Sequence, residues 1–189
     1  MVFHFAKFKW KESLFLCAID AMKRTLILNQ LQIEQKIRRM AWQLFEDHFR
    51  EKEIWVAGIA GRGFTLAENL VAALKEIKDC PTIHLLELKV NKQNPLADLA
   101  SATEKQSELQ GKVLIVVDDV LNSGKTLLYG VKKFMDIPLK KIATLVLVDR
   151  NHRSFPVNAD YVGLSLATTL LQNIQVVLSA EERAVYLED

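Results

Sequence analysis

The sequence predicts an α/β fold in which a mostly parallel sheet is covered by helices on both faces. Two apolar runs, VLIVV at residues 113–117 and ATLVLV at 143–148, are typical of strands buried on both sides. They alternate with segments whose apolar residues recur every three or four positions, as in amphipathic helices. At 189 residues the chain is long enough for one domain with a sizeable core and too short for two typical domains.

The first predicted elements are a strand, a helix and a second strand. Residues 25–28 (TLIL) have the composition of a strand. A helix is expected to begin at Asn29, because Asn29 and Gln32 have the spacing of a capping box before a periodic apolar pattern. Residues 53–58 (EIWVAG) form a short apolar run that ends in glycine, which indicates a buried strand.

The middle of the chain continues the alternation. Residues 65–78 carry leucine or isoleucine on one helical face, and residues 82–89 (TIHLLELK) are predicted to form a strand. Residues 90–111 are polar with little periodicity, and so long a stretch inside a compact domain is usually functional or disordered. The remaining predicted elements are a strand at 113–117, a helix at 126–137, and strands at 143–148, 161–163, 174–178 and 184–187.

Composition excludes several classes of protein. Lys and Arg total 25 against 23 Asp and Glu, a net charge of +2, which argues against a disordered polyelectrolyte or a surface built wholly for nucleic acid. Cys17 and Cys80 lie too far apart in sequence for a CxxC pair, so reduced thiols in a cytoplasmic protein are the simplest interpretation. No apolar run approaches the length of a membrane span.

Residues 1–21 do not match the rest of the chain. Four aromatic residues occur among the first ten, and the apolar run that follows is short and is interrupted by Asp20. These features disfavour a signal peptide and leave an extra helix or an upstream extension as alternatives. We expect Met22 to be the functional start, with a single domain over residues 22–189.

The chemistry is expected where the strand at 113–117 ends. Asp118 and Asp119 follow the strand, and residues 122–126 (NSGKT) form a short glycine loop that opens a helix. Backbone N–H groups at such a helix N-terminus suit one phosphate, and the Ser123 and Thr126 hydroxyls add donors. The two carboxylates suit hydroxyls or a divalent cation a few ångströms away. A sugar phosphate satisfies both groups, with its phosphate at the N–H donors and its hydroxyls at the carboxylates.

Two other interpretations of this loop are weaker. Gly124-Lys125-Thr126 matches the end of a Walker A motif, but that motif requires glycine where this chain has Asp119. A capped helix with incidental acids is also possible in principle, although two idle carboxylates directly after a buried strand are costly. A phosphate and hydroxyl site is therefore favoured over a nucleoside triphosphatase.

Residues 113–126 are similar to the phosphoribosyl pyrophosphate signature of type I phosphoribosyltransferases. The chain most resembles the bifunctional family of pyrimidine-operon attenuation regulators and uracil phosphoribosyltransferases. Residues 147–163 (LVDRNHRSFPVNADYVG) are similar to that family's VDRGHR, proline and ADYVG pattern. Residues 58–63 (GIAGRG) lie where the family has its pyrophosphate loop. The resemblance covers roughly residue 25 to the C-terminus.

The resemblance implies a type I phosphoribosyltransferase fold with a small hood formed by the C-terminal strands and a homodimer. It also implies transfer of the phosphoribosyl group of phosphoribosyl pyrophosphate to a free base, with uracil as the expected base. Mg²⁺ is the implied cofactor, held mainly by substrate oxygens. The implied roles are ribose hydroxyl binding by Asp118 and Asp119, 5′-phosphate binding by Asn122, Ser123, Gly124, Lys125 and Thr126, pyrophosphate binding by Gly61 and Arg62, a position near the base or pyrophosphate for Arg150, and a base pocket lined by Ile174.

Two departures from the family pattern affect these expectations. Residues 90–95 (VNKQNP) stand where the family has a Tyr-Arg-Asp-Asp run in a flexible loop, so Lys92 is the one candidate there for the arginine's charge. Lys125 also replaces a usual arginine. A nucleotide-sensing, RNA-binding regulator with weak turnover is therefore the alternative. Its candidate basic residues are Lys36, Arg38, Arg39, Lys132, Lys133, Lys140 and Lys141.

Overall fold

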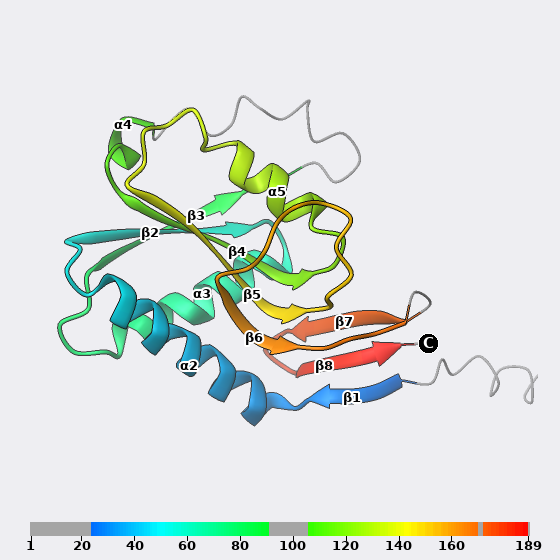
Figure 1. The fold of residues 1–189 in the computed structure, drawn as a ribbon. Helices are drawn as coiled ribbons and strands as arrows, with labels where there is room; N and C mark the ends of the chain where they lie inside the picture. Colours follow the sequence, from blue (N-terminus) through cyan, green and yellow to red (C-terminus); the bar gives the residue numbers. More distant parts are fainter. Residues whose placement is uncertain (1–23, 91–105, 170–171, 189) are drawn as a thin grey trace, which may run out of the picture.

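Five parallel strands form the central sheet, in the order β3-β2-β4-β5-β6 (Figure 1). The structure is a computed structural model and describes residues 24–90, 106–169 and 172–188. The predicted parallel α/β sheet is confirmed. The strands are β2 Glu53–Ile59, β3 Thr82–Leu88, β4 Val113–Leu121, β5 Lys141–Asp149 and β6 Tyr161–Ser165.

Helices cover both faces of this sheet, and alternate strand residues face the two layers. On one face, α2 (Gln30–His48) and α3 (Arg62–Lys75) share a core with Ile54 and Val56 of β2. On the other, the short α4 (Gln106–Leu109) and α5 (Lys125–Lys132) belong to the core that contains Trp55 and Ala57. Within the described residues, none of the helices combines the length and the apolar character needed to span a bilayer.

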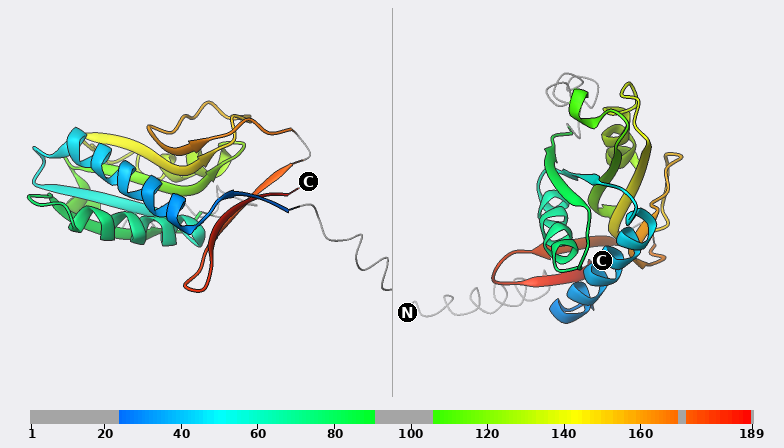
Figure 2. Two further views of the ribbon diagram at one scale, coloured as in Figure 1. Left: turned by 90° about the horizontal axis from the view of Figure 1, so that it is seen from below. Right: turned by 90° about the vertical axis from the view of Figure 1, so that its left-hand side faces the viewer.

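A second, antiparallel sheet of three strands forms a hood beside the carboxyl ends of the central strands (Figures 1 and 2). Its order is β1-β8-β7, where β1 is Arg24–Leu28, β7 is Asn173–Leu178 and β8 is Arg183–Glu188. The hood was expected from the C-terminal strands alone. The structure adds β1, because β7 pairs with only one edge of β8 and β1 pairs with the other.

The start of α2 confirms the predicted capping box. The Asn29 side chain accepts a hydrogen bond from the Gln32 backbone N–H, and the Gln32 side chain accepts one from the Asn29 N–H, both at 2.9 Å. Two N–H groups that the first turn would leave without partners are thereby satisfied. The helix then crosses the start of β6, where Arg39 donates to the carbonyls of Val162 and Gly163.

Several element boundaries differ from the sequence prediction, and three of them bear on the argument. Strand β4 continues to Leu121, since it keeps pairing with β5, so both acids lie within the strand. Helix α3 begins at Arg62, three residues early, directly after Gly61. Helix α5 ends at Lys132. The chain continues through tighter turns, in one of which the Phe134 N–H donates to the Val131 carbonyl. A similar bond from Met135 N–H to the Lys132 carbonyl shows that the α-helical pattern has been replaced by i to i−3 bonding beyond Lys132.

A buried polar cluster joins α2 to the start of β6, away from the carboxyl ends of the strands. The Tyr161 hydroxyl donates to Asp47 at 2.7 Å and lies 3.2 Å from Nε2 of His48. Because the hydroxyl hydrogen goes to Asp47, the His48 ring must donate its Nε2–H to the tyrosine oxygen. Burial, and then the charge of Lys141, lower the pKa of His48 below its ordinary 6.5.

We expect His48 to make stability depend on pH. The unfolded chain binds the proton more readily, so the contribution of His48 is present above pH 6.5 and is lost as the pH falls through its lower folded pKa. The free energy of unfolding should therefore fall less steeply for His48→Gln than for the wild type between neutral pH and about pH 5. Urea titrations at each pH measure the difference, and parallel curves would contradict the assignment.

Candidate functional site

The candidate site is a cavity of about 220 Å³ between the carboxyl ends of the central strands and the hood. Parallel α/β sheets bind ligands at this edge, where the strand order reverses direction. In this sheet β2 and β4 are neighbours, whereas the chain passes through β3 between them. The residues lining the cavity are Arg62, Asp118, Asp119, Val120, Asn122, Ser123, Thr126, Arg150, Asn173 and Ile174.

Two adjacent carboxylates occupy the end of β4. Asp118 and Asp119 are each only 7% exposed, and the backbone N–H of Asp119 donates to Oδ1 of Asp118 at 2.9 Å. The first turn of α3 lies against them at Gly63. A Cβ on Gly63 would come within 3.1 Å of both Asp118 Oδ1 and the Val117 carbonyl oxygen. The glycine therefore lets a helix N-terminus, with its positive dipole, approach the acids.

Arg62 supplies the opposite charge at the first position of α3. Its Nε lies 2.8 Å from Oδ2 of Asp119, and its Nη1 donates to the Val176 carbonyl of β7 at 3.4 Å. Its side chain is half exposed, so it stays accessible to a ligand in the cavity. Gly61 precedes it with a φ of 91°, a conformation that glycine adopts without strain. The arginine thus joins an acid of β4 to the hood.

The loop of residues 122–126, here called the phosphate loop, turns from β4 into α5. Gly124 adopts the left-handed conformation with a φ of 83°. The Ser123 carbonyl accepts hydrogen bonds from the backbone N–H groups of Ser154 and Phe155, which fixes the loop from the side of the next strand. A smaller hollow of about 40 Å³ lies in this loop and extends to Asp118 and Leu127. Its size and its helix N-terminus suit one phosphate group.

Arg150 is buried at the end of β5, with 5% of its surface exposed. Its guanidinium donates to the Asn122 side chain of the phosphate loop at 3.0 Å and to the Thr168 hydroxyl at 2.8 Å. It also donates to the backbone carbonyls of Thr169 and Gln172. Arg150 therefore contacts both the phosphate loop and the segment that leads into the hood.

The structure brings most of the sequence-predicted residues together. Asp118, Asp119, Arg62, Arg150 and the phosphate loop residues Asn122, Ser123 and Thr126 line the main cavity with Ile174, and Gly124 lines the smaller hollow. Gly61 and Lys125 each directly precede a lining residue in the sequence, but they line neither hollow themselves. Lys92 lies outside the described residues. Sequence reasoning missed Asn173, whose one available signal was its position at the start of the strand containing Ile174.

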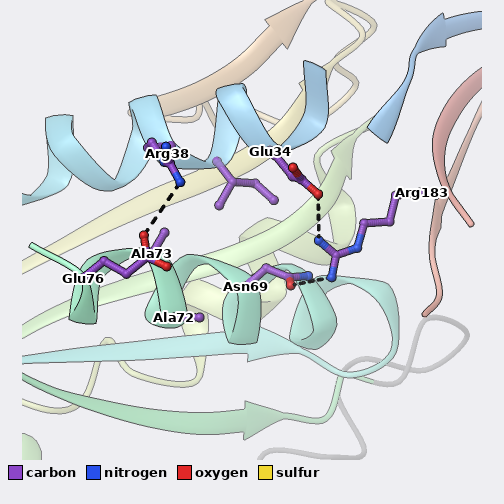
Figure 3. A pocket seen from close by; sticks show the side chains of 8 residues that line it. Glu34, Arg38, Asn69, Ala72, Ala73, Glu76 and Arg183 are labelled. Atoms are coloured by element: carbon purple, nitrogen blue, oxygen red, sulfur yellow. Dashed lines mark hydrogen bonds and ion pairs between the residues drawn. The ribbon is translucent and has the colours of Figure 1, made fainter. Parts of the chain in front are cut away.

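A second hollow of about 220 Å³ lies between α2 and α3 (Figure 3). Two arginines and two glutamates line it, and they pair with one another: Arg38 with Glu76 at 3.8 Å and Arg183 with Glu34 at 3.6 Å. These charges cancel, and the hollow contains none of the residues of the sequence motifs. The cavity at the strand ends is therefore the better candidate for binding a phosphorylated ligand.

Most of the chain is similar to known proteins of one family. Residues 24–181 match the family model described as a phosphoribosyl transferase domain. A relative called bifunctional protein PyrR, from Pelotomaculum thermopropionicum, is 32% identical over 178 residues, covering 89% of this chain and 98% of its own length. The relative of the same name from Fusobacterium nucleatum is 32% identical over 164 residues, covering 83% of this chain and 92% of its own length.

Solved structures show the same fold. A hypoxanthine-guanine phosphoribosyltransferase from Bacillus anthracis superimposes with a TM-score of 0.63 at 26% identity, covering 77% of this chain and 83% of the other. A hypoxanthine phosphoribosyltransferase from Trypanosoma cruzi gives a TM-score of 0.71 at 17% identity, covering 87% and 95%. The second likeness concerns the fold alone.

Gly124→Ala is expected to damage the phosphate loop. A Cβ there would lie 2.5 Å from Cγ1 of Val157, in addition to the backbone cost of a positive φ. Gly111→Ala is the matched control, because its φ is also positive (71°) but a Cβ would meet nothing within 4 Å. Both should lose about 1–2 kcal/mol of unfolding free energy from the backbone, and Gly124→Ala about 1 kcal/mol more from overpacking.

Denaturant unfolding of the two variants measures the difference. Adding Val157→Ala to Gly124→Ala should recover the overpacking part and leave the backbone part. Equal losses at the two glycines would contradict the close approach of Val157 to the loop.

Proposed function

The chain belongs to the phosphoribosyl transferase domain family and is a phosphoribosyltransferase, and on that premise we propose that its base is uracil and that Mg²⁺ assists the reaction. The observation that supports the phosphoribosyl side of this reaction is the presence of two buried carboxylates and a glycine loop in adjoining hollows, whereas the choice of base rests on the sequence resemblance. Phosphoribosyl pyrophosphate has the matching groups, a diol and a 5′-phosphate on one sugar. The products are the nucleotide and pyrophosphate.

The two halves of the substrate require opposite surroundings. The 5′-phosphate is proposed to occupy the phosphate loop, where backbone N–H groups and the hydroxyls of Ser123 and Thr126 donate to it. The ribose hydroxyls would donate to Asp118 and Asp119. Charge-assisted hydrogen bonds of this kind are about twice as strong as neutral ones. The same acids would repel the phosphate, so they select the orientation of the sugar.

The remaining charge of the substrate is on the pyrophosphate. Arg62 is proposed to bind it, because its planar guanidinium offers paired donors and its first-turn position adds the dipole of α3. In the reaction a base nitrogen forms a bond to C1 of ribose while the bond from C1 to the pyrophosphate oxygen breaks. Positive charge develops on the sugar ring, and Asp118 and Asp119 lie on its side of the cavity. No covalent protein nucleophile takes part.

Mg²⁺ fits the donors that the site offers. It prefers oxygen ligands and keeps several that the protein does not supply, and the carboxylates of Asp118 and Asp119 are the candidates on this chain. Among the residues that the structure describes, no three His, Cys, Asp or Glu side chains gather into a metal-binding group. Substrate oxygens would therefore complete the coordination. When bound, the ion would neutralise charge on the departing pyrophosphate.

Uracil is proposed from the resemblance, with the hood strand β7 as the base-side wall. Ile174 and Asn173 line the cavity from this strand. An apolar side chain can pack on the ring, while an amide can hydrogen-bond to a pyrimidine edge. The sequence resemblance also supports a cytoplasmic homodimer, which we include in the proposal.

RNA-dependent regulation is the second candidate, and the name bifunctional protein PyrR carried by the relatives favours it. Several of the candidate basic residues are engaged within the chain. Arg38 pairs with Glu76, Lys140 pairs with Glu51, and the buried Lys133 donates to the Lys89 carbonyl. Retention of a pyrimidine-operon leader RNA that weakens steeply with salt would support this function, since phosphate contacts release counterions.

The enzyme proposal is tested by incubating the protein with phosphoribosyl pyrophosphate, Mg²⁺ and a panel of free bases while following pyrophosphate release. We expect release with uracil and its loss when the metal is chelated. Release with another base alone would correct the substrate. Tight nucleotide binding without turnover on any base would remove the enzymatic claim and favour the regulator.

The double variant Asp118→Asn/Asp119→Asn should lose substrate binding while staying folded. Hydrogen bonds to charged groups contribute about 1.5–3 kcal/mol each, so affinity for phosphoribosyl pyrophosphate is expected to fall by about a hundredfold or more. Asp136→Asn, at an exposed position beyond α5, is the control for the same chemical change. Titration calorimetry measures both, and unchanged affinity in the double variant would show that the sugar binds elsewhere.

A further inference from the structure

We propose that Arg150 is a positioning residue that couples the phosphate loop to the hood strand β7, so that occupancy of one half of the cavity orders the other. The proposal deepens the proposed function, because the coupled halves are the phosphoribosyl and base sides of the same site. In this proposal one buried guanidinium makes two proposed substrate-binding segments respond to each other, although they are more than 45 residues apart in sequence.

The contacts of Arg150 fall into two groups. Toward the phosphate loop, Nη1 donates to Oδ1 of Asn122 at 3.0 Å. Toward the hood, Nε donates to the Thr168 hydroxyl at 2.8 Å, and Nη2 donates to the carbonyls of Thr169 and Gln172. Gln172 directly precedes β7, whose first residues, Asn173 and Ile174, line the cavity. A movement of the guanidinium therefore reaches both walls.

The base of the Arg150 side chain is fixed. Its backbone N–H donates to the Leu121 carbonyl at 3.0 Å, which continues the pairing of β4 with β5 up to the edge of the cavity. The side chain is 5% exposed and extends from this rigid edge. Rigid elements with fixed side chains transmit a displacement instead of absorbing it.

Donor counting explains why the residue has to be arginine. A guanidinium has five N–H donors in a planar fork, and the four contacts above use four of them. At most one donor, on Nη1, is left for a ligand. The direct contact with base or pyrophosphate expected from the sequence would therefore use a single hydrogen bond. A lysine, with three donors at one point, cannot hold the same four acceptors.

Two other arginines connect the hood to the central sheet and its helices, and their contacts can be compared with those of Arg150. Arg62 donates to the Val176 carbonyl in the middle of β7, on the pyrophosphate side. Arg183 of β8 contacts Glu34 at 3.6 Å and Asn69 at 3.4 Å, at the hollow between α2 and α3 (Figure 3). Arg183 thus joins the hood to the body without touching the cavity, which makes it the matched control for Arg150.

The test is hydrogen exchange of the full chain with and without ribose 5-phosphate, which probes the phosphoribosyl side of the cavity in the absence of a base. In the wild type, we expect exchange to slow at residues 122–128 and also at residues 173–178, the latter by about fivefold or more, the lower end of ordinary coupling between sites. In Arg150→Lys, residues 122–128 should still respond, while residues 173–178 should not. Arg183→Lys should behave like the wild type.

A second measurement separates coupling from a purely structural effect. Ribose 5-phosphate should tighten uracil binding in the wild type, and the ratio of the two uracil affinities should fall toward one in Arg150→Lys. A structural defect would weaken both affinities and leave their ratio unchanged. Asn122→Ala, which removes the single contact toward the loop, should also bring the ratio toward one, and it serves if Arg150→Lys does not fold.

Two results would overturn the coupling. The response of residues 173–178 could persist in both Arg150→Lys and Asn122→Ala, or it could vanish equally in Arg183→Lys, which would indicate general loosening of the hood. A different failure identifies the proposed function as wrong: if ribose 5-phosphate does not slow exchange of residues 122–128 in the wild type, the loop is not the phosphate site, and the coupling falls with it.

Discussion

Two adjacent carboxylates at the end of a buried strand set the requirement that the rest of the site satisfies. Asp118 and Asp119 are 7% exposed, and burying ionised groups is costly unless opposite charges and donors surround them. The chain provides the ion pair of Arg62 with Asp119, an N–H donor to Asp118, and a helix N-terminus brought close by Gly63. Arg62 and the two acids are also among the groups proposed to hold a phosphorylated sugar, so charge balance and the proposed ligand binding use the same residues.

The hood depends on the same arrangement from its other side. Its strands pair with one another and not with the central sheet, so side chains make the connection. Arg62 and Arg150 make two of these connections at the cavity, and Arg183 makes one away from it. Apolar hood residues such as Val176 and Val185 also pack into the core that α2 and α3 share. Because two of the three arginines lie where substrate is proposed to bind, the base-side wall is proposed to respond to the phosphate side.

Sequence patterns predicted the parts of the structure that local physics determines. The apolar runs specified the buried parallel strands, the Asn29 and Gln32 spacing specified the start of α2, and the acids and glycine loop located the cavity. What they could not predict depends on tertiary contacts. The strand character of Asp118 and Asp119 comes from pairing with β5, and the place of β1 comes from the free edge of β8. The contacts of Arg150 join distant segments, and no spacing in the sequence records them.

The replacement of the family's arginine by Lys125 has a structural explanation in the loop itself. Lys125 is the first residue of α5, its side chain lines neither hollow, and its backbone N–H donates to the Ser123 hydroxyl at 3.3 Å. The phosphate is expected to be held by backbone N–H groups and hydroxyls, and those do not change when one long cation replaces another. The near-neutral charge of the chain is consistent with this, because an anion site made of backbone amides and one arginine needs no basic surface.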